Sequence, residues 1–341
     1  MRIKTAALAT LAALTFAGVA EARDQVKIAG SSTVLPFANV VAEAFGKANP
    51  KFKTPIVESG GSSGGLKTFC AGVGENTIDI ANSSRAIKST EVEACKAAGV
   101  NDIIEVKIGY DGIVFANPVK GANFVLEPKH LYLALAREVP QGGKLVANPY
   151  TNWKQVDASL PDQEIRVFIP GEKHGTREVF EEKVMAVGCK DFAEIKAISD
   201  SKAKHAACVS VRKDGRSVDI DGDYTETLAR IQSTPTGIGV FGLSFYDQNR
   251  DKVKVAPVSG VVPSLETIAD GKYPVSRPLF FYVKKAHLGA IPGLKEYVEF
   301  FLSDRMVGEE GAAVEKGLIP MPANQLKQQR EKFTKGTTVG S

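Results

Sequence analysis

The sequence predicts an α/β protein built in two lobes. Short runs rich in Val and Ile alternate along the chain with longer amphipathic stretches, which is typical of strands layered with helices. With 341 residues, the chain also exceeds a comfortable size for a single hydrophobic core. Its composition, 43% hydrophobic and 24% charged, is that of an ordinary globular protein and excludes disorder and a coiled coil.

The elements follow from local patterns. The predicted strands are short, rich in β-branched residues and bounded by Gly or Pro; they are residues 26–29, 55–58, 78–81, 103–108, 112–117, 165–169, 237–241, 253–258 and 279–283. The predicted helices carry apolar residues at three- and four-residue steps; they are residues 36–48, 64–71, 90–98, 176–187, 225–234 and 292–302. We expect the polar tail from residue 324 onward to be a frayed helix with a loose end.

The first residues indicate export. Arg2 and Lys4 precede an apolar run over residues 6–20, and Ala20 and Ala22 are the small residues that signal peptidase requires. We therefore predict a signal peptide over residues 1–22, with a buried core helix as the alternative. No later segment approaches the roughly 20 apolar residues of a membrane span, so we expect a soluble protein in the periplasm.

The charge balance limits the partners. The 43 Lys and Arg residues exceed the 39 Asp and Glu residues by only four, and no basic run occurs. This excess is too small to favour nucleic acid or an anionic membrane, so a small ligand is the better hypothesis. No Walker A, zinc-protease or EF-hand pattern is present, and we predict neither a cofactor nor a metal.

The four cysteines fit an oxidising compartment. They form two pairs that are close in sequence, Cys70 with Cys95 and Cys189 with Cys208, and an even number in an exported protein predicts two disulfides. A zinc site is the alternative, but no CxxC occurs and the four His residues are scattered.

Three segments share one design, in which a strand leads into a turn of Gly, Ser and Thr and a helix begins at once. They are residues 29–33, 60–65 and 171–176. Each offers free backbone N–H groups, hydroxyl donors and the positive end of a helix dipole, so together they predict a cradle for an oxyanion. Taken singly, each is also a simple helix N-cap.

A fourth turn, residues 82–85, adds a guanidinium. Arg85 has the geometry to bind an oxyanion through two hydrogen bonds, or alternatively to pair with a surface carboxylate. The second turn also satisfies G-x-S-x-G, the nucleophile elbow of serine hydrolases, with Ser62 as nucleophile and His174 or His205 as base. Ser62 lies too near the start of the mature chain for the upstream strands of that fold, so an exported hydrolase remains only an alternative.

In this order, these residues resemble the periplasmic phosphate-binding proteins of ABC importers, the PstS family. The resemblance covers nearly the whole mature chain and is carried by residues 30–33 (GSST), 61–65 (GSSGG), 79–85 (DIANSSR), 111–118 (DGIVFANP), 174–176 (HGT) and 273–279 (YPVSRPL).

The resemblance implies a type II periplasmic-binding-protein fold, with two lobes joined by two crossing segments near residues 112–118 and 276–283. Lobe I would comprise residues 23–112 plus 277–341 and lobe II residues 113–276. The implied function is a monomeric, non-catalytic solute-binding protein that captures inorganic phosphate between its lobes and delivers it to the membrane permease of an ABC importer. A binding protein or sensor for sulfate, arsenate or tungstate is the alternative.

The site residues follow position by position from the same resemblance. They are Ser32, Thr33 and Val34 in the first turn, Ser62 in the second, Ser84 and Arg85 in the fourth, and His174, Gly175 and Thr176 in the third. Many members have Ser in place of His174. The family's site Asp aligns with Ser84 and its site Arg with Pro170, so we expect Arg85 or Arg177 to supply the guanidinium.

The missing carboxylate at Ser84 leaves the selection of phosphate over sulfate unexplained. Bound phosphate carries a proton that sulfate lacks, and an ionised carboxylate accepts such a proton while repelling sulfate. We nominate Asp111 as this acceptor, with neutral His174 as second choice. The alternative role of Asp111 is to cap a turn at Gly112.

Overall fold

The computed structural model describes residues 23–172 and 175–340. Its main sheet has the strand order β2-β1-β3-β11-β4-β9-β7-β8, with β10 paired to β4. The strands are β1 (Lys27–Gly30), β2 (Ile56–Ser59), β3 (Ile80–Ser83), β4 (Ile103–Pro118), β7 (Val167–Pro170), β8 (Ser217–Ile220), β9 (Ile238–Gly242), β10 (Val253–Ala256) and β11 (Ser276–Lys284). A separate hairpin joins β5 (Glu138–Gln141) to β6 (Lys144–Ala147).

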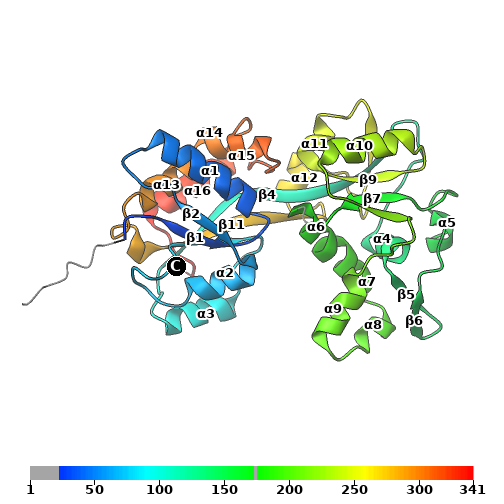
Figure 1. Cartoon of the computed structure of the whole chain (residues 1–341), viewed down its shortest axis with the longest axis horizontal. Helices are drawn as coiled ribbons and strands as arrows, with labels where there is room; N and C mark the ends of the chain where they lie inside the picture. The colour runs from blue at the N-terminus through cyan, green and yellow to red at the C-terminus, as the bar shows by residue number, and fades with distance from the viewer. Residues whose placement is uncertain (1–22, 173–174, 341) are drawn as a thin grey trace, which may run out of the picture.

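Helices surround the two ends of this sheet and give the molecule two lobes, with β4 and β11 running between them (Figure 1). One lobe carries α1 (Leu35–Ala48), α2 (Gly61–Phe69), α3 (Ser89–Ala97), α13 (Leu294–Phe301), α14 (Asp304–Val307), α15 (Ala312–Glu315) and α16 (Ala323–Lys335). The other carries α4 (Pro128–Leu135), α5 (Trp153–Val156), α6 (Gly175–Val179), α7 (Ala186–Cys189), α8 (Ala193–Lys196), α9 (Ser201–Val209), α10 (Tyr224–Ser233), α11 (Leu243–Asp247) and α12 (Leu265–Ala269). The predicted α/β fold in two lobes is confirmed.

The central strand β4 differs from its prediction. The sequence predicts two strands with a turn near Gly112, whereas β4 is continuous over 16 residues. Its first part pairs with β11 as far as Gly112, and the pairing with β9 begins at the next residue, Ile113. Because Asp111 and Gly112 both lie inside this ladder, Asp111 caps no turn there. The strand continues past Gly109, whose φ of +151° suits glycine.

The carboxy-terminal tail is also more ordered than predicted. Helix α16 buries Leu326 and Phe333, and Arg330 donates through Nε to the carbonyl oxygen of Leu302 at 2.7 Å. Beyond the helix, the Val339 N–H bonds the Ile103 carbonyl at 2.8 Å. The sequence of α16 is polar and has only two residues that become buried, so it gives little sign of an ordered helix. The contacts that stabilise the helix come from segments distant in the sequence.

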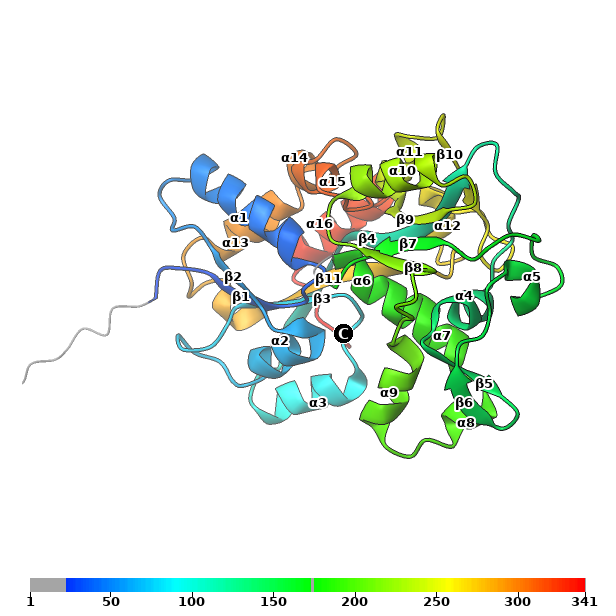
Figure 2. The same cartoon turned by 45° about the vertical axis from the view of Figure 1, so that its right-hand side comes forward.

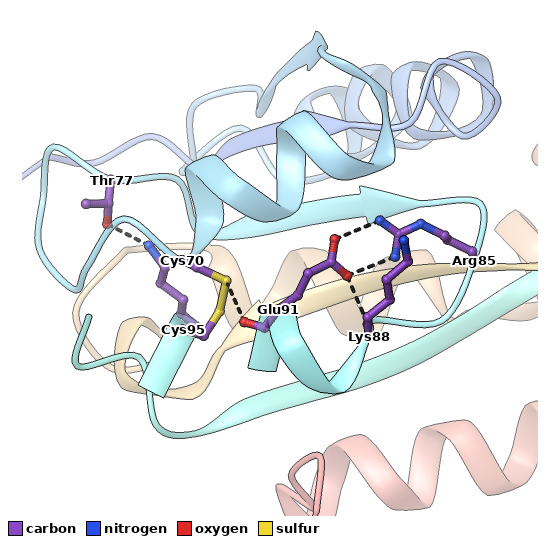
Figure 3. The surroundings of a disulfide bond; sticks show 7 residues. Cys70, Thr77, Arg85, Lys88, Glu91 and Cys95 are labelled. Carbon is purple, nitrogen blue, oxygen red and sulfur yellow. Dashed lines mark hydrogen bonds and ion pairs between the residues drawn. A yellow bond between two sulfur atoms is a disulfide. The ribbon is translucent and has the colours of Figure 1, made fainter. Parts of the chain in front are cut away.

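Both predicted disulfides are present, Cys70–Cys95 and Cys189–Cys208. The first joins the carboxyl end of α2 to α3, beside a network around Glu91 (Figure 3). The second joins the end of α7 to α9. In the part of the chain that the structure describes, no helix has the length and apolar character needed to cross a membrane.

Candidate anion site

The first turn follows β1 and is held against its neighbours by close backbone packing. A Cβ on Gly30 would lie 2.1 Å from the Asn82 carbonyl oxygen, and one on Gly65 would lie 2.4 Å from the Gly30 Cα. Only glycine fits at such distances, so the turns after β1 and β3 and the start of α2 are drawn together. The GSST and GSSGG motifs therefore meet in space.

Two hydroxyls of this turn point to one acceptor. Ser32 Oγ and Thr33 Oγ1 lie 3.1 and 2.5 Å from Oε2 of Glu178, which comes from α6 in the other lobe. The Val34 N–H faces the Ser31 Oγ at a long 3.4 Å. Ser32 and Thr33 thus already act as donors to an anionic oxygen.

The second and fourth turns hydrogen-bond each other. The Ser84 N–H donates to Ser62 Oγ at 3.0 Å, and the two hydroxyl oxygens are 3.1 Å apart, both buried. Arg85 binds both oxygens of Glu91 at 2.7 and 2.8 Å (Figure 3). It also donates to Ser63 Oγ at 2.9 Å. These bonds lower the pKa of the Glu91 carboxyl. Arg85 therefore adopts its alternative role, an ion pair within its own lobe.

The guanidinium at the centre belongs to Arg277, at the start of β11. Its side chain is 2% exposed. It donates to Thr33 Oγ1 at 2.8 Å and to Glu182 Oε2 at 2.7 Å, and lies 3.5 Å from Glu178 Oε2. One cation thus joins the first turn to two carboxylates of the opposite lobe.

Asp111 stands opposite Arg277 in the β4–β11 ladder. Its Oδ2 lies 3.7 Å from Arg277 Nε, too far for a hydrogen bond, and both atoms are buried without a hydrogen-bond partner. Burial, more than any neighbour, raises the pKa of Asp111 to about 6. A buried acceptor with unused capacity lies next to the first turn.

The other lobe contributes α6 and the helical stretch that continues it. Thr176 Oγ1 accepts a hydrogen bond from the hydroxyl of the half-buried Tyr224 at 3.3 Å. Arg177, the second expected guanidinium, instead bonds Glu181, Asp219 and the Pro170 carbonyl within its own lobe. His174 lies outside the described residues.

At the lobe boundary α6 lies beside β11 (Figure 2). Two cavities are lined by residues of both lobes there. One, of about 260 Å³, is lined by residues 60–64, Ser84, Arg85, Glu178 and Glu182. The other, of about 230 Å³, is lined among others by Thr33, Asp111 and Thr176, with Phe37 and Phe245 on its apolar side. Among the described residues, no group of three His, Cys, Asp or Glu side chains is placed to hold a metal.

The structure thus brings Ser32, Thr33, Asp111 and Thr176 to the lobe boundary, while Ser62 and Ser84 line the other cavity. Arg85 lines that cavity as well, but its guanidinium is bound to Glu91, and Arg177 is bound to carboxylates within its own lobe. The sequence analysis includes Arg277 in the YPVSRPL motif but assigns it no role in the site. The pattern that could have indicated a role is its position in the predicted crossing segment 276–283, an otherwise uncharged run.

Comparisons with known proteins agree with this architecture. A family model described as a PBP superfamily domain matches residues 16–305. The chain is 32% identical to the phosphate-binding protein PstS of Staphylococcus saprophyticus over 316 residues, covering 91% of this chain and 84% of the relative. It is 31% identical to protein SphX of Synechococcus elongatus over 319 residues, covering 91% and 81% of the two chains.

Among solved structures, a possible phosphate binding protein from Planctomyces limnophilus superposes with a TM-score of 0.73 at 26% identity, covering 93% of this chain and all of that one. The two-lobed fold with two crossing strands is the type II periplasmic-binding fold that the resemblance implied. The chain therefore belongs to the PBP superfamily and, within it, to the PstS family of phosphate-binding proteins.

Proposed function

We propose that this protein captures inorganic phosphate between its lobes and delivers it to the membrane permease of an ABC importer. The observation that carries the proposal is the convergence of Ser32, Thr33 and Arg277 on a single anionic oxygen. Hydroxyl donors and a buried guanidinium are the groups that bind oxyanions. The relatives named phosphate-binding proteins support phosphate as that anion.

The mechanism requires no chemistry on the ligand. Residues 23–112 and 277–341 form one lobe and residues 113–276 the other, and an anion that bonds both favours the closed arrangement by its differential affinity. The closed shape is what a permease recognises. Among the described residues, Ser62 has the Ser84 hydroxyl as its partner, and a hydroxyl is no general base, which supports binding rather than hydrolysis.

Asp111 supplies the selection of phosphate over sulfate in this proposal. Above pH 6 its carboxylate is ionised and only accepts hydrogen bonds, so it suits a protonated phosphate oxygen and repels fully ionised sulfate. Its unpartnered Oδ2 and its place beside Thr33 and Thr176 support this role.

Export through cleavage after Ala22 completes the proposal. The basic and apolar start of the chain supports it, and so do two disulfides, which persist in oxidising compartments. Amino-terminal sequencing of the protein isolated from the periplasm tests this, and we expect the mature chain to begin at Arg23.

Calorimetric titration of phosphate-stripped protein tests the binding function. We expect saturation at one phosphate per chain, unchanged when excess sulfate is present. Absence of binding would exclude the proposed function, and equal competition by sulfate would exclude phosphate selectivity.

A further inference from the structure

Glu178 occupies the donors that the proposed function assigns to phosphate. Its Oε2 accepts from Ser32 Oγ at 3.1 Å and from Thr33 Oγ1 at 2.5 Å, and lies 3.5 Å from an Arg277 amino group. We propose that Glu178 is an internal competitor, a carboxylate of one lobe that binds the anion cradle of the other and must be displaced by phosphate.

The competition follows from the number of protons available. Each hydroxyl has one proton to donate, and that of Thr33 already points to Glu178 while its oxygen accepts from Arg277. The Thr33 hydroxyl cannot donate its proton to a phosphate oxygen while it donates that proton to Glu178. Anion and carboxylate therefore exclude each other at this position.

Charge adds to the exclusion. Three carboxylates, Asp111, Glu178 and Glu182, lie within 4 Å of the single guanidinium of Arg277. A phosphate anion entering beside all three would meet more negative than positive charge in a largely buried place, which is unfavourable. Departure of Glu178 removes one negative charge and releases the donors together.

Glu178 is well placed to leave. Its side chain is 32% exposed, whereas that of Arg277 is 2% exposed, so the carboxylate has solvent to move into and the guanidinium stays. Binding is then an exchange of one anion for another across the lobe boundary. An anion that interacts with these donors more weakly than the Glu178 carboxylate does cannot displace it. Glu178 therefore limits binding to anions that interact with the donors more strongly than a carboxylate.

The inference rests on the proposed function, and its test compares two carboxylates on the same arginine. Glu178→Gln keeps the shape and removes the charge, and Glu178→Ala removes the competing acceptor as well. Glu182→Gln is the matched control, because Glu182 contacts Arg277 at 2.7 Å and no hydroxyl of the first turn in the described structure. Each variant is titrated with inorganic phosphate in the calorimeter after its fold is checked by circular dichroism.

We expect Glu178→Gln to bind phosphate at least about tenfold more tightly than wild type, about 1.4 kcal/mol, with Glu178→Ala at least as tight. Glu182→Gln also removes a negative charge beside Arg277, so it is expected to raise affinity, but by a clearly smaller factor than Glu178→Gln, because Glu182 is half exposed and its loss frees no hydroxyl donor of the first turn. In a phosphate-bound crystal structure, Glu178 should no longer contact Thr33.

The outcomes separate the two proposals. If neither wild type nor Glu178→Gln binds phosphate, the proposed function fails and the competitor role with it. If wild type binds phosphate and both Glu178 variants bind equally or more weakly, the competitor role alone is overturned; weaker binding would make Glu178 an acceptor for the bound ligand. An equal gain in phosphate affinity in Glu182→Gln would mean that the loss of any nearby negative charge explains the effect, and this too would overturn the competitor role of Glu178.

Discussion

The two lobes hold their halves of the cleft in different ways. In lobe I the polar groups are fixed by short contacts with one another: Ser84 with Ser62, and Arg85 with Glu91. The Cys70–Cys95 disulfide lies at the end of the same short helix, α2, that carries Ser62. In lobe II, Thr176 and Glu178 stand at the start of a helical stretch whose disulfide, at Cys189, lies at its far end.

This difference indicates that lobe I is the preorganised half and lobe II the adjustable one. Glu178 accepts hydrogen bonds from Ser32 and Thr33, and Glu182 accepts one from Arg277, so both carboxylates bind groups of lobe I. Part of this stretch, Phe180–Met185, is π-helical. The π-helix is rare in proteins as a whole, and where it occurs it is often at a functional site. We therefore expect phosphate affinity to depend more on lobe I residues than on lobe II residues.

The largest effect is expected from Arg277→Gln. The buried guanidinium is the cation common to the first turn and both lobe II carboxylates, and its loss leaves Asp111 without a counter-charge. Removing one partner of a buried charge pair between protein and ligand costs about 3 kcal/mol of binding free energy, so phosphate affinity should fall at least about a hundredfold in calorimetric titration.

Arg85→Gln serves as the control for this prediction. Its guanidinium is bound to Glu91 and Ser63, so the loss in affinity should be well under tenfold. A larger loss in Arg85→Gln than in Arg277→Gln would assign the site cation to Arg85. The double variant Arg277→Gln with Asp111→Asn should recover thermal stability, which separates loss of binding from loss of folding.

The two disulfides sharpen the comparison between lobes. Replacing either pair by Ser should lower the free energy of unfolding by roughly 3 kcal/mol, the scale that chain entropy gives for such loops. Only loss of Cys70–Cys95 should also weaken phosphate binding severalfold, because α2 carries Ser62. Chemical denaturation and calorimetry of both double variants measure the two effects. Equal losses of affinity would show that the lobes are not held differently.

Single hydroxyls should have smaller effects. Ser62→Ala is expected to weaken phosphate binding by about 1–3 kcal/mol, the scale of a hydrogen bond to a charged group. Thr176→Val should lie at the lower end of this range, since the Thr176 hydroxyl is shared with Tyr224. Titrations in which Thr176→Val loses more than Ser62→Ala would reverse the assignment of the preorganised lobe.

Local motifs predicted the elements of the site but not its centre. The turn residues Ser32, Thr33 and Ser62 follow from a strand, a Gly-Ser-Thr turn and a helix, all of which are local patterns. Arg277 meets Asp111 only through the pairing of β4 with β11, strands far apart in sequence, and no local pattern reports that register. The same long-range pairing explains why two predicted strands are one strand, β4.

Other features had usable signals. Glu91 follows Arg85 by six residues, in the first turn of α3, and an acidic residue so near in sequence favoured the ion pair that forms. The Gly142-Gly143 pair, with φ of +61° and +80°, marks the turn of the β5–β6 hairpin. Helix α9 was missed because its one buried residue is Cys208, so it shows no apolar stripe.

Asp111→Asn should change selectivity more than affinity. The amide keeps the size of the side chain but is uncharged and presents an NH2 donor. Sulfate is therefore no longer repelled, and a phosphate proton is left with a neutral amide oxygen, a weaker acceptor than a carboxylate. The ratio of phosphate to sulfate affinity, measured by competition titration, should fall at least about tenfold, or roughly 1.4 kcal/mol. An unchanged ratio would remove Asp111 from the site, and a wild type that prefers sulfate would overturn the phosphate assignment.

The same substitution has a signature in stability that binding cannot produce. Burial raises the folded-state pKa of Asp111 from 3.8 to about 6, so ionisation of this group opposes folding. That penalty is absent below pH 3.8, grows as the pH rises toward 6, and is complete above it. Measured without phosphate, Asp111→Asn should therefore gain stability over wild type across this window and keep a constant gain at higher pH. A gain that is flat from pH 4 to 8 would place Asp111 in a solvated position, where it has no reason to select a protonated anion.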